Sequence, residues 1–231
     1  MDTINLKIIG TSHIAKQSLD EVRAAINDGS PDIIALELDR RRFFALTSRK
    51  KQEGKLSIRN IMKIGLNGFI FSLIGEFAQK KLGKMVGVTP GSEMTAAIRL
   101  AKKKKIPLAL IDQDIEITLK RFSKSLTWRE KMNFVVDIFR GVFSRKDLEL
   151  DFDLRKVPEE KIIKKLIKEM EQRYPNVYNV LVRERNEFMA EKLAQIIANN
   201  PEKKILAILG AGHEEEIMER VSHILQLKNK I

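Results

Sequence analysis

The sequence predicts an α/β fold in which a central, mostly parallel sheet is flanked by helices and carries a large helical insertion. Four short runs rich in Ile, Leu and Val predict buried strands, because they lack the polar alternation of a half-exposed strand. They lie at residues 6–9, 33–38, 107–111 and 204–209. Stretches with apolar residues at helical spacing separate these runs, as in repeated strand–helix–strand units.

The first and last units of this pattern are the clearest. Residues 15–27 link the first two strands through an amphipathic helix that the run Gly29-Ser30-Pro31 ends, and such a crossover is right-handed. The turn at 90–93 begins a second helix over 94–105, and a C-terminal helix is predicted over 214–226.

The middle of the chain is predominantly helical. Amphipathic patterns predict helices between the third and fourth strands, at 127–143, 159–173 and 177–199. A further stretch at 57–86 predicts one long or two broken helices, which either pack as core or cap helices or lie against a membrane or a partner helix. We therefore expect one domain over 1–231, with helical insertions at approximately 55–88 and 115–200.

Composition gives the chain a basic character and excludes thiol chemistry. The 43 Lys and Arg residues exceed the 31 Asp and Glu residues, and the net charge of +12 is spread along the chain. This charge favours anionic partners, although a heavily charged soluble surface is the simpler explanation. Without cysteine, the chain has no disulfide, thiolate metal site or Cys nucleophile. Nucleic acid is not an expected partner, because no recognition motif or aromatic stacking surface accompanies the charge.

Neither a secretory signal nor a membrane span is predicted. The N-terminus enters a strand directly, without the basic and apolar regions of a signal peptide. The most apolar run, 64–75, is shorter than the roughly 18 to 20 residues that cross a bilayer. We expect a cytoplasmic protein, or one associated with the cytoplasmic side of a membrane.

Polar residues follow each predicted strand and are expected to converge. Ligands of an open parallel sheet bind beyond the carboxyl ends of its strands. The polar residues at those ends are Thr11, Ser12, His13, Glu37, Asp39, Asp112, Asp114 and His213. Gly10 and Gly210 are expected to let the chain turn sharply as it leaves the sheet, and Gly212 keeps the backbone beside His213 free of side chains.

These side chains suit a divalent metal or acid–base chemistry. Two His and one or two carboxylates form a suitable shell for Zn, Mn, Co or Fe. Without a metal, a His would act as general base and Glu37 would orient it. Helix N-termini after each His would favour an anionic ligand. Glu37 needs a partner in its apolar surroundings, and a metal, a His or an Arg would serve.

Several candidates also have structural explanations. A single His at a strand end is more often a hydrogen-bonded structural residue than a ligand. Asp39 is equally suited to cap the helix that follows it, and Asp112 and Asp114 are suited to helix starts. His223 lies within the C-terminal helix and is interpreted as structural. On the helix before the fourth strand, Glu184-Arg185 lies at the edge of the apolar stripe, so either residue could face the site.

Six short motifs stand in a fixed order along nearly the whole chain. They are Gly10-Thr11-Ser12-His13 with Ser18; Glu37-Leu38-Asp39 with Arg41 or Arg42; Pro90-Gly91-Ser92-Glu93-Met94; Ile111-Asp112-Gln113-Asp114 with Thr118 and Arg121; Glu184-Arg185-Asn186 with Met189-Ala190; and Gly210-Ala211-Gly212-His213. A lone Gly-x-x-His means little, but the ordered set is specific. It resembles the TraB family, which includes the PrgY pheromone-shutdown proteins and is distantly similar to the Tiki and GumN proteins.

The resemblance implies both a site and a function. Tiki proteins are described as divalent-metal-dependent proteases with paired Gly-x-x-His motifs, which correspond here to His13 and His213, with Glu37 as the acidic residue. Arg185 would be an electrostatic partner at this site. Asn186 stands where relatives often have Asp, which weakens a catalytic role for that position. TraB and PrgY proteins limit the activity of small peptide pheromones, by degradation or by sequestration.

We therefore expect a divalent-metal-dependent, peptidase-like hydrolase. His13, Glu37 and His213 would hold a Mn, Co or Zn ion, with Glu37 binding it or acting as general base. Arg185 would stabilise the developing oxyanion. Substrate-binding residues are expected at Thr11, Ser12, Arg41, Glu93, Asp112, Glu184 and Gly212. The alternative is a non-catalytic module that sequesters a peptide or another anionic ligand. No organic cofactor is indicated.

Partners other than a peptide are less defined by the sequence. Whether the protein forms a homodimer is left open by the sequence. Many TraB proteins continue into several transmembrane helices, whereas this sequence stops at Ile231, soon after the second motif. Membrane association through such C-terminal segments is therefore an open expectation.

Overall fold

The computed structural model describes residues 5–11, 16–48, 91–143 and 160–228, and it confirms the α/β class. Four strands form one sheet in the order β1-β4-β2-β3, and all neighbouring strands are parallel. The strands are β1 (Leu6–Thr11), β2 (Ile33–Leu36), β3 (Leu108–Leu110) and β4 (Ile205–Gly210). The last strand in the sequence therefore lies between the first two.

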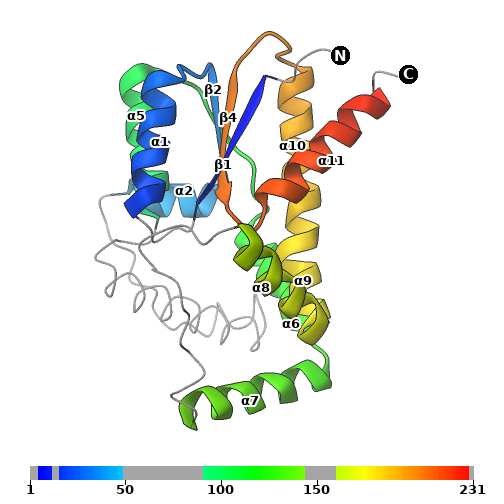
Figure 1. The fold of residues 1–231 in the computed structure, drawn as a ribbon. Helices are drawn as coiled ribbons and strands as arrows, with labels where there is room; N and C mark the ends of the chain where they lie inside the picture. Colours follow the sequence, from blue (N-terminus) through cyan, green and yellow to red (C-terminus); the bar gives the residue numbers. More distant parts are fainter. Residues whose placement is uncertain (1–4, 12–15, 49–90, 144–159, 229–231) are drawn as a thin grey trace.

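Helices cover both faces of the sheet, and every residue of β4 is buried between them (Figure 1). One face packs against α1 (Lys16–Asp28) and α5 (Ser92–Lys104), the other against α10 (Glu184–Ala198) and α11 (Glu214–Lys228). Alternate residues of β2 belong to the two separate hydrophobic cores, as the two-residue period of a strand requires.

The strand ends differ from the predicted ones in ways that move site residues. β1 runs through Gly10 to Thr11, and Thr11 pairs with Gly210, the last residue of β4. Gly10 and Thr11 therefore belong to the strand and not to a turn. β2 ends at Leu36 rather than at residue 38, although the amide of Glu37 still donates to a β4 carbonyl at 3.1 Å. Apolar runs indicate burial, whereas backbone pairing sets where a strand ends, and composition does not encode that pairing.

Short helices follow two of the strands. α2 (Arg40–Thr47) begins with Asp39, whose Oδ1 accepts hydrogen bonds from two amides of the first turn, at 2.7 and 2.9 Å. The capping role of Asp39 is thereby confirmed. α6 (Ile115–Ser125) opens the helical insertion expected from about residue 115, and Asp114 caps it, as its suitability for a helix start indicated.

The described helices between the third strand and α10 lie beyond the carboxyl ends of the strands (Figure 1). After α6 come α7 (Trp128–Phe143), α8 (Glu160–Arg173), α9 (Pro175–Tyr178) and a π-helical turn, η1 (Asn179–Arg183), that leads into α10. The helix predicted at 177–199 therefore consists of three joined elements. The helix predicted at 57–86 lies outside the described residues. Within the part of the chain that is described, no helix is long and apolar enough to cross a membrane.

Glu130 joins α7 to α9 through hydrogen bonds that its carboxylate accepts. Its Oε2 accepts hydrogen bonds from the amide and hydroxyl of Thr127, at 3.0 and 2.9 Å, which closes a capping box at the start of α7. Its Oε1 accepts from the amide of Asn176 in α9, at 2.8 Å. Burial raises the pKa of Glu130, but the hydrogen bonds from Thr127 and Asn176 outweigh burial and hold the pKa below its ordinary value of 4.5.

We predict that Glu130→Gln lowers the free energy of unfolding by about 1–2 kcal/mol at pH 7, because an amide nitrogen would face backbone donors. The folded-state pKa of Glu130 lies below its ordinary value of 4.5. The stabilisation by Glu130 is therefore complete above about pH 4.5 and decreases as the pH falls from there through the lower folded-state pKa. Urea unfolding at several pH values measures this difference, with the exposed Glu191→Gln on α10 as control. A difference that did not decrease on acidification below about pH 4.5 would contradict the assignment.

Gly10 is required by close packing rather than by a turn. A Cβ at this position would lie 2.9 Å from the Cα of Ala211 and would also collide with the Glu214 carboxylate. At Gly212 the nearest atom to such a Cβ is the Cδ1 of Ile167, at 3.5 Å, which is an ordinary contact. The two glycines of the matched motifs therefore have different physical roles.

We predict that Gly10→Ala destabilises the protein by about 1–3 kcal/mol, because the backbone of the second motif must move away from β1. Gly212→Ala is the matched control and is expected to change stability by no more than about 0.5 kcal/mol. Thermal or urea unfolding of the two variants tests this. Equal losses would show that the contact between Gly10 and Ala211 is not limiting.

Candidate functional site

The structure brings Glu37, Asp112, Arg185 and His213 together at the carboxyl edge of the sheet. Glu37 directly follows β2, Asp112 lies just after β3, Arg185 is in the first turn of α10, and His213 directly precedes α11. Both carboxylates are buried. Four of the predicted site residues thus form one cluster, contributed by four separate segments of the chain.

Arg185 reaches this cluster because it continues the buried face of α10. That face packs on the sheet through Met189, Ala190 and Leu193, and Arg185 and Asn186 stand one helical turn before them. The sheet ends at this level. One face of α10 therefore has two parts. Its first turn presents polar side chains to the edge of the sheet, and its later turns present apolar side chains to the core.

The guanidinium of Arg185 joins the two buried carboxylates. Its Nε donates to Oδ1 of Asp112 at 3.0 Å and its Nη2 to Oδ2 at 2.7 Å, and Nη2 also pairs with Oε1 of Glu37. Its Nη1 donates to the carbonyl of Leu181 at 3.1 Å. Burial lowers the pKa of Arg185, but the charges of Glu37 and Asp112 outweigh burial and raise it, so the side chain stays charged.

Further hydrogen bonds fix the same carboxylates from other sides. Oε2 of Glu37 accepts from the amide of Gly210 at 2.6 Å, which ties the end of β2 to the second Gly-x-x-His motif. Arg42 of α2 pairs with Asp112 and donates to the backbone carbonyl of Glu37 at 3.2 Å. It also pairs with Asp39 at 2.9 Å. Both buried carboxylates therefore have cationic partners within the described structure.

His213 is held in one tautomer by a chain of two side chains. Nδ2 of Asn186 lies 2.5 Å from Oε2 of Glu216, and a carboxylate only accepts, so the amide nitrogen faces Glu216. Oδ1 of Asn186 then accepts from Nδ1–H of His213 at 2.5 Å. In the neutral ring Nε2 is then the unprotonated nitrogen, and it lies 3.6 Å from Oε1 of Glu37 and 3.5 Å from Nη1 of Arg185. A catalytic role for Asn186 was not expected, because relatives often have Asp at this position, and nothing in the spacing of Asn186 indicates its contact with His213.

The remaining predicted residues lie in other surroundings. Arg41 pairs with Glu116 and lies 3.6 Å from Asp114, and Glu184 pairs with Arg121 at 2.6 Å. Thr11 is buried at the end of β1, and Glu93 is buried in the first turn of α5. Gly212 lines a groove between α8 and α11. Ser12 and His13 lie outside the described residues.

The described side chains do not form a complete metal site. Among them, no group of three or more His, Asp and Glu residues could hold a metal ion. His213 Nε2 and Glu37 Oε1 lie 3.6 Å apart, close to the separation of about 3.3 Å between two ligands of a tetrahedral zinc ion. Arg185 donates to the same Oε1, so a cation at this place would compete with the guanidinium.

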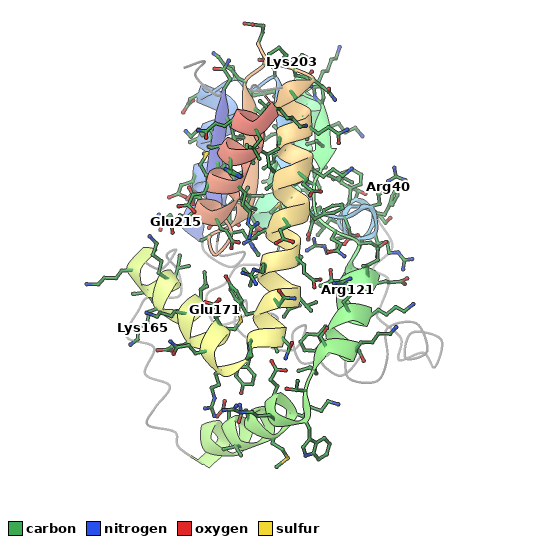
Figure 2. All side chains as sticks on the ribbon, turned by 90° about the vertical axis from the view of Figure 1, so that its right-hand side faces the viewer. Arg40, Arg121, Lys165, Glu171, Lys203 and Glu215 are labelled. Atoms are coloured by element: carbon green, nitrogen blue, oxygen red, sulfur yellow. The ribbon has the colours of Figure 1, made fainter. Side chains whose placement is uncertain are left out.

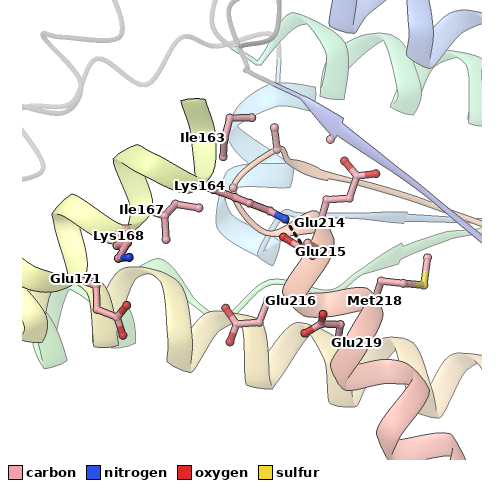
Figure 3. Close-up of a pocket in the computed structure, with 13 residues that line it drawn as sticks. Ile163, Lys164, Ile167, Lys168, Glu171, Glu214, Glu215, Glu216, Met218 and Glu219 are labelled. Carbon is pink, nitrogen blue, oxygen red and sulfur yellow. Dashed lines mark hydrogen bonds and ion pairs between the residues drawn. The ribbon is translucent and has the colours of Figure 1, made fainter. Parts of the chain in front are cut away.

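A groove of about 780 Å³ lies beside the second Gly-x-x-His motif (Figure 3). α8 lines one side and α11 the other, and Lys164 bridges to Glu215 across it at 2.7 Å. The glutamates that line it are Glu171, Glu214, Glu215, Glu216 and Glu219, against Lys164 and Lys168. Three of these glutamates form the first turn of α11, where they already complement the positive end of the helix dipole. The groove is therefore acidic.

Comparison with known proteins gives one family. The model of the TraB/PrgY/gumN family matches residues 2–219. An uncharacterized protein of Methanocaldococcus jannaschii is 40% identical over 231 residues, which cover 97% of this chain and 54% of that protein. A human TraB domain-containing protein is 22% identical over 251 residues, which cover 98% of this chain and 65% of that protein. The chain thus spans about half to two thirds of the length of these relatives.

We predict that Arg185→Met lowers the free energy of unfolding by about 3–5 kcal/mol, because two buried carboxylates lose a shared cation. Arg121→Met is the control, since Arg121 pairs with Glu184 at an exposed position, where the loss is expected to stay below about 1 kcal/mol. Urea unfolding compares the two, and Arg185→Lys gives an intermediate variant. Similar losses in both methionine variants would contradict a structural role for the Arg185 network.

Proposed function

Because the chain belongs to the TraB/PrgY/gumN family, we propose that it is a divalent-metal-dependent hydrolase of peptides whose site is centred on His213 and Glu37. The observation that supports this most directly is the orientation of His213. Its Nδ1–H is bound by Asn186, which Glu216 orients in turn. Histidines that bind metals are held in this way, through a hydrogen bond from the second ring nitrogen.

In this proposal the described residues divide into donors and positioning residues. A bound divalent ion would supply a Lewis acid and a water that ionises near neutral pH. His213 and Glu37 would be two of the residues that hold it, and His13 would be the third that the sequence indicates. Arg185 and Arg42 hold Glu37 and Asp112 in position. The N–H groups of Arg185 point at these carboxylates and at Leu181, so we propose that Arg185 positions the site rather than stabilising an oxyanion.

Elemental mass spectrometry and titration calorimetry with Mn²⁺, Co²⁺ and Zn²⁺, on protein without a histidine tag, test metal binding. We predict at least about tenfold weaker binding in His213→Ala and in Glu37→Gln, because each removes one donor. His223→Ala is the matched control, since His223 is an exposed histidine of α11, and it should bind the metal as the wild type does. Retained binding in His213→Ala would remove the proposed site.

A screen with a broad peptide library tests hydrolysis on the metal-loaded protein. We expect cleavage that a chelator abolishes and that Glu37→Gln and His213→Ala both lose. If the loaded wild-type protein leaves every peptide intact, the hydrolase proposal is wrong, whatever its metal affinity.

The acidic groove between α8 and α11 favours a second candidate, a module that captures a peptide without cleaving it. Its glutamates would select a peptide of positive charge, in contrast to the anionic ligand suggested by helix N-termini alone. Saturable binding of a basic peptide that survives chelation, with the peptide recovered intact, would support capture over hydrolysis.

A further inference from the structure

The helix α7 packs against the protein through its polar side. Glu130, Asn133 and Asp137 share one helix face, at spacings of three and four residues. Asn133 donates to the carbonyl of Arg173 at 3.3 Å, and Asp137 accepts from Nε of Arg173 at 2.6 Å. Together with Glu130 bound to Asn176, these contacts direct the polar face of α7 toward α8 and α9.

The opposite side of α7 presents apolar residues to solvent. Trp128, Met132 and Val136 follow one another at intervals of four residues and are 75%, 47% and 39% exposed. We call these three residues the α7 stripe. A helix on the surface of a soluble protein normally has the reverse arrangement, with its apolar side inward. Water does not stabilise an exposed apolar stripe, and adjacent exposed apolar residues are typical of interaction surfaces.

Basic residues flank the α7 stripe on α7 itself. Arg129 and Lys131 stand next to Trp128 and Met132 in the sequence and project from the two sides of the stripe. The exposed Lys120 and Lys124 belong to α6, the preceding helix of the chain. The acidic residues Glu130 and Asp137 point the other way, into their contacts with α8 and α9. α7 lies at the opposite end of the described structure from Lys203 (Figure 2).

We propose that the α7 stripe docks the protein on the surface of a bilayer that contains anionic lipid. Tryptophan favours the boundary between headgroups and acyl chains, and flanking Lys and Arg are attracted to anionic headgroups. A second copy of the chain fits the stripe less well. A symmetric contact would place Arg129 and Lys131 of each copy against the same face of the other, between molecules of net charge +12.

Trp128 is the only tryptophan of the chain, so intrinsic fluorescence reports directly on the α7 stripe. Vesicles of phosphatidylcholine alone and vesicles that also contain phosphatidylserine provide the two surfaces. We expect emission to shift to shorter wavelength, and brominated acyl chains to quench it, only with phosphatidylserine present. Co-sedimentation with these vesicles should fall as salt is raised. Met132→Glu with Val136→Glu keeps the probe and should weaken binding about tenfold or more.

Phe44→Glu is the matched control, because Phe44 on α2 is also apolar and 63% exposed, and circular dichroism checks that both variants fold. The control should bind vesicles as the wild type does. Equal loss in both variants, or no binding of the wild type to either vesicle, overturns the proposal. Equal binding to phosphatidylcholine alone also overturns it. A shift without vesicles that grows with protein concentration, with dimers in sedimentation equilibrium, would assign the α7 stripe to a second copy instead.

Discussion

The pairing of Arg185 with Glu37 and Asp112 is the interaction on which the rest of the site depends. Both carboxylates are buried, and a buried charge without a partner costs several kcal/mol. Arg185 pairs with both, and the second oxygen of Glu37 binds the amide of Gly210. One cation therefore connects the ends of β2, β3 and β4 to the first turn of α10, and so joins the helical region to the sheet.

Much of the fold was predictable, because burial of parallel strands leaves a strong pattern in the sequence. The four apolar runs correspond to the four strands, and Gly29-Ser30-Pro31 separates α1 from β2 as expected. The direction in which α7 faces was not predictable. Amphipathic spacing shows that a helix has two faces, and the usual rule places the apolar face inward. At α7 the hydrogen bonds of Glu130 and Asp137 with residues some 40 positions away decide otherwise.

The candidate site was predictable in part for the same kind of reason. Residues at strand ends converge by topology, so the approach of Glu37, Asp112 and His213 follows from the strand assignment. The need of Glu37 for a partner followed from its apolar surroundings, but the choice among a metal, a His and an Arg did not. Asn186 shows the limit most clearly, because its role arises from the packing of α10 beside α11, which no local pattern contains.

Because β4 lies between β1 and β2, a nascent chain cannot assemble this sheet until β4 has left the ribosome. β1 and β2 do not pair with each other, and both wait for a strand that begins at Ile205. Until then, the apolar faces of α1 and α5 have only part of a sheet to cover, and such a chain is exposed to aggregation and to chaperones. His213 leaves the ribosome directly after that strand. The last strand of the fold and the last part of the site are therefore translated together.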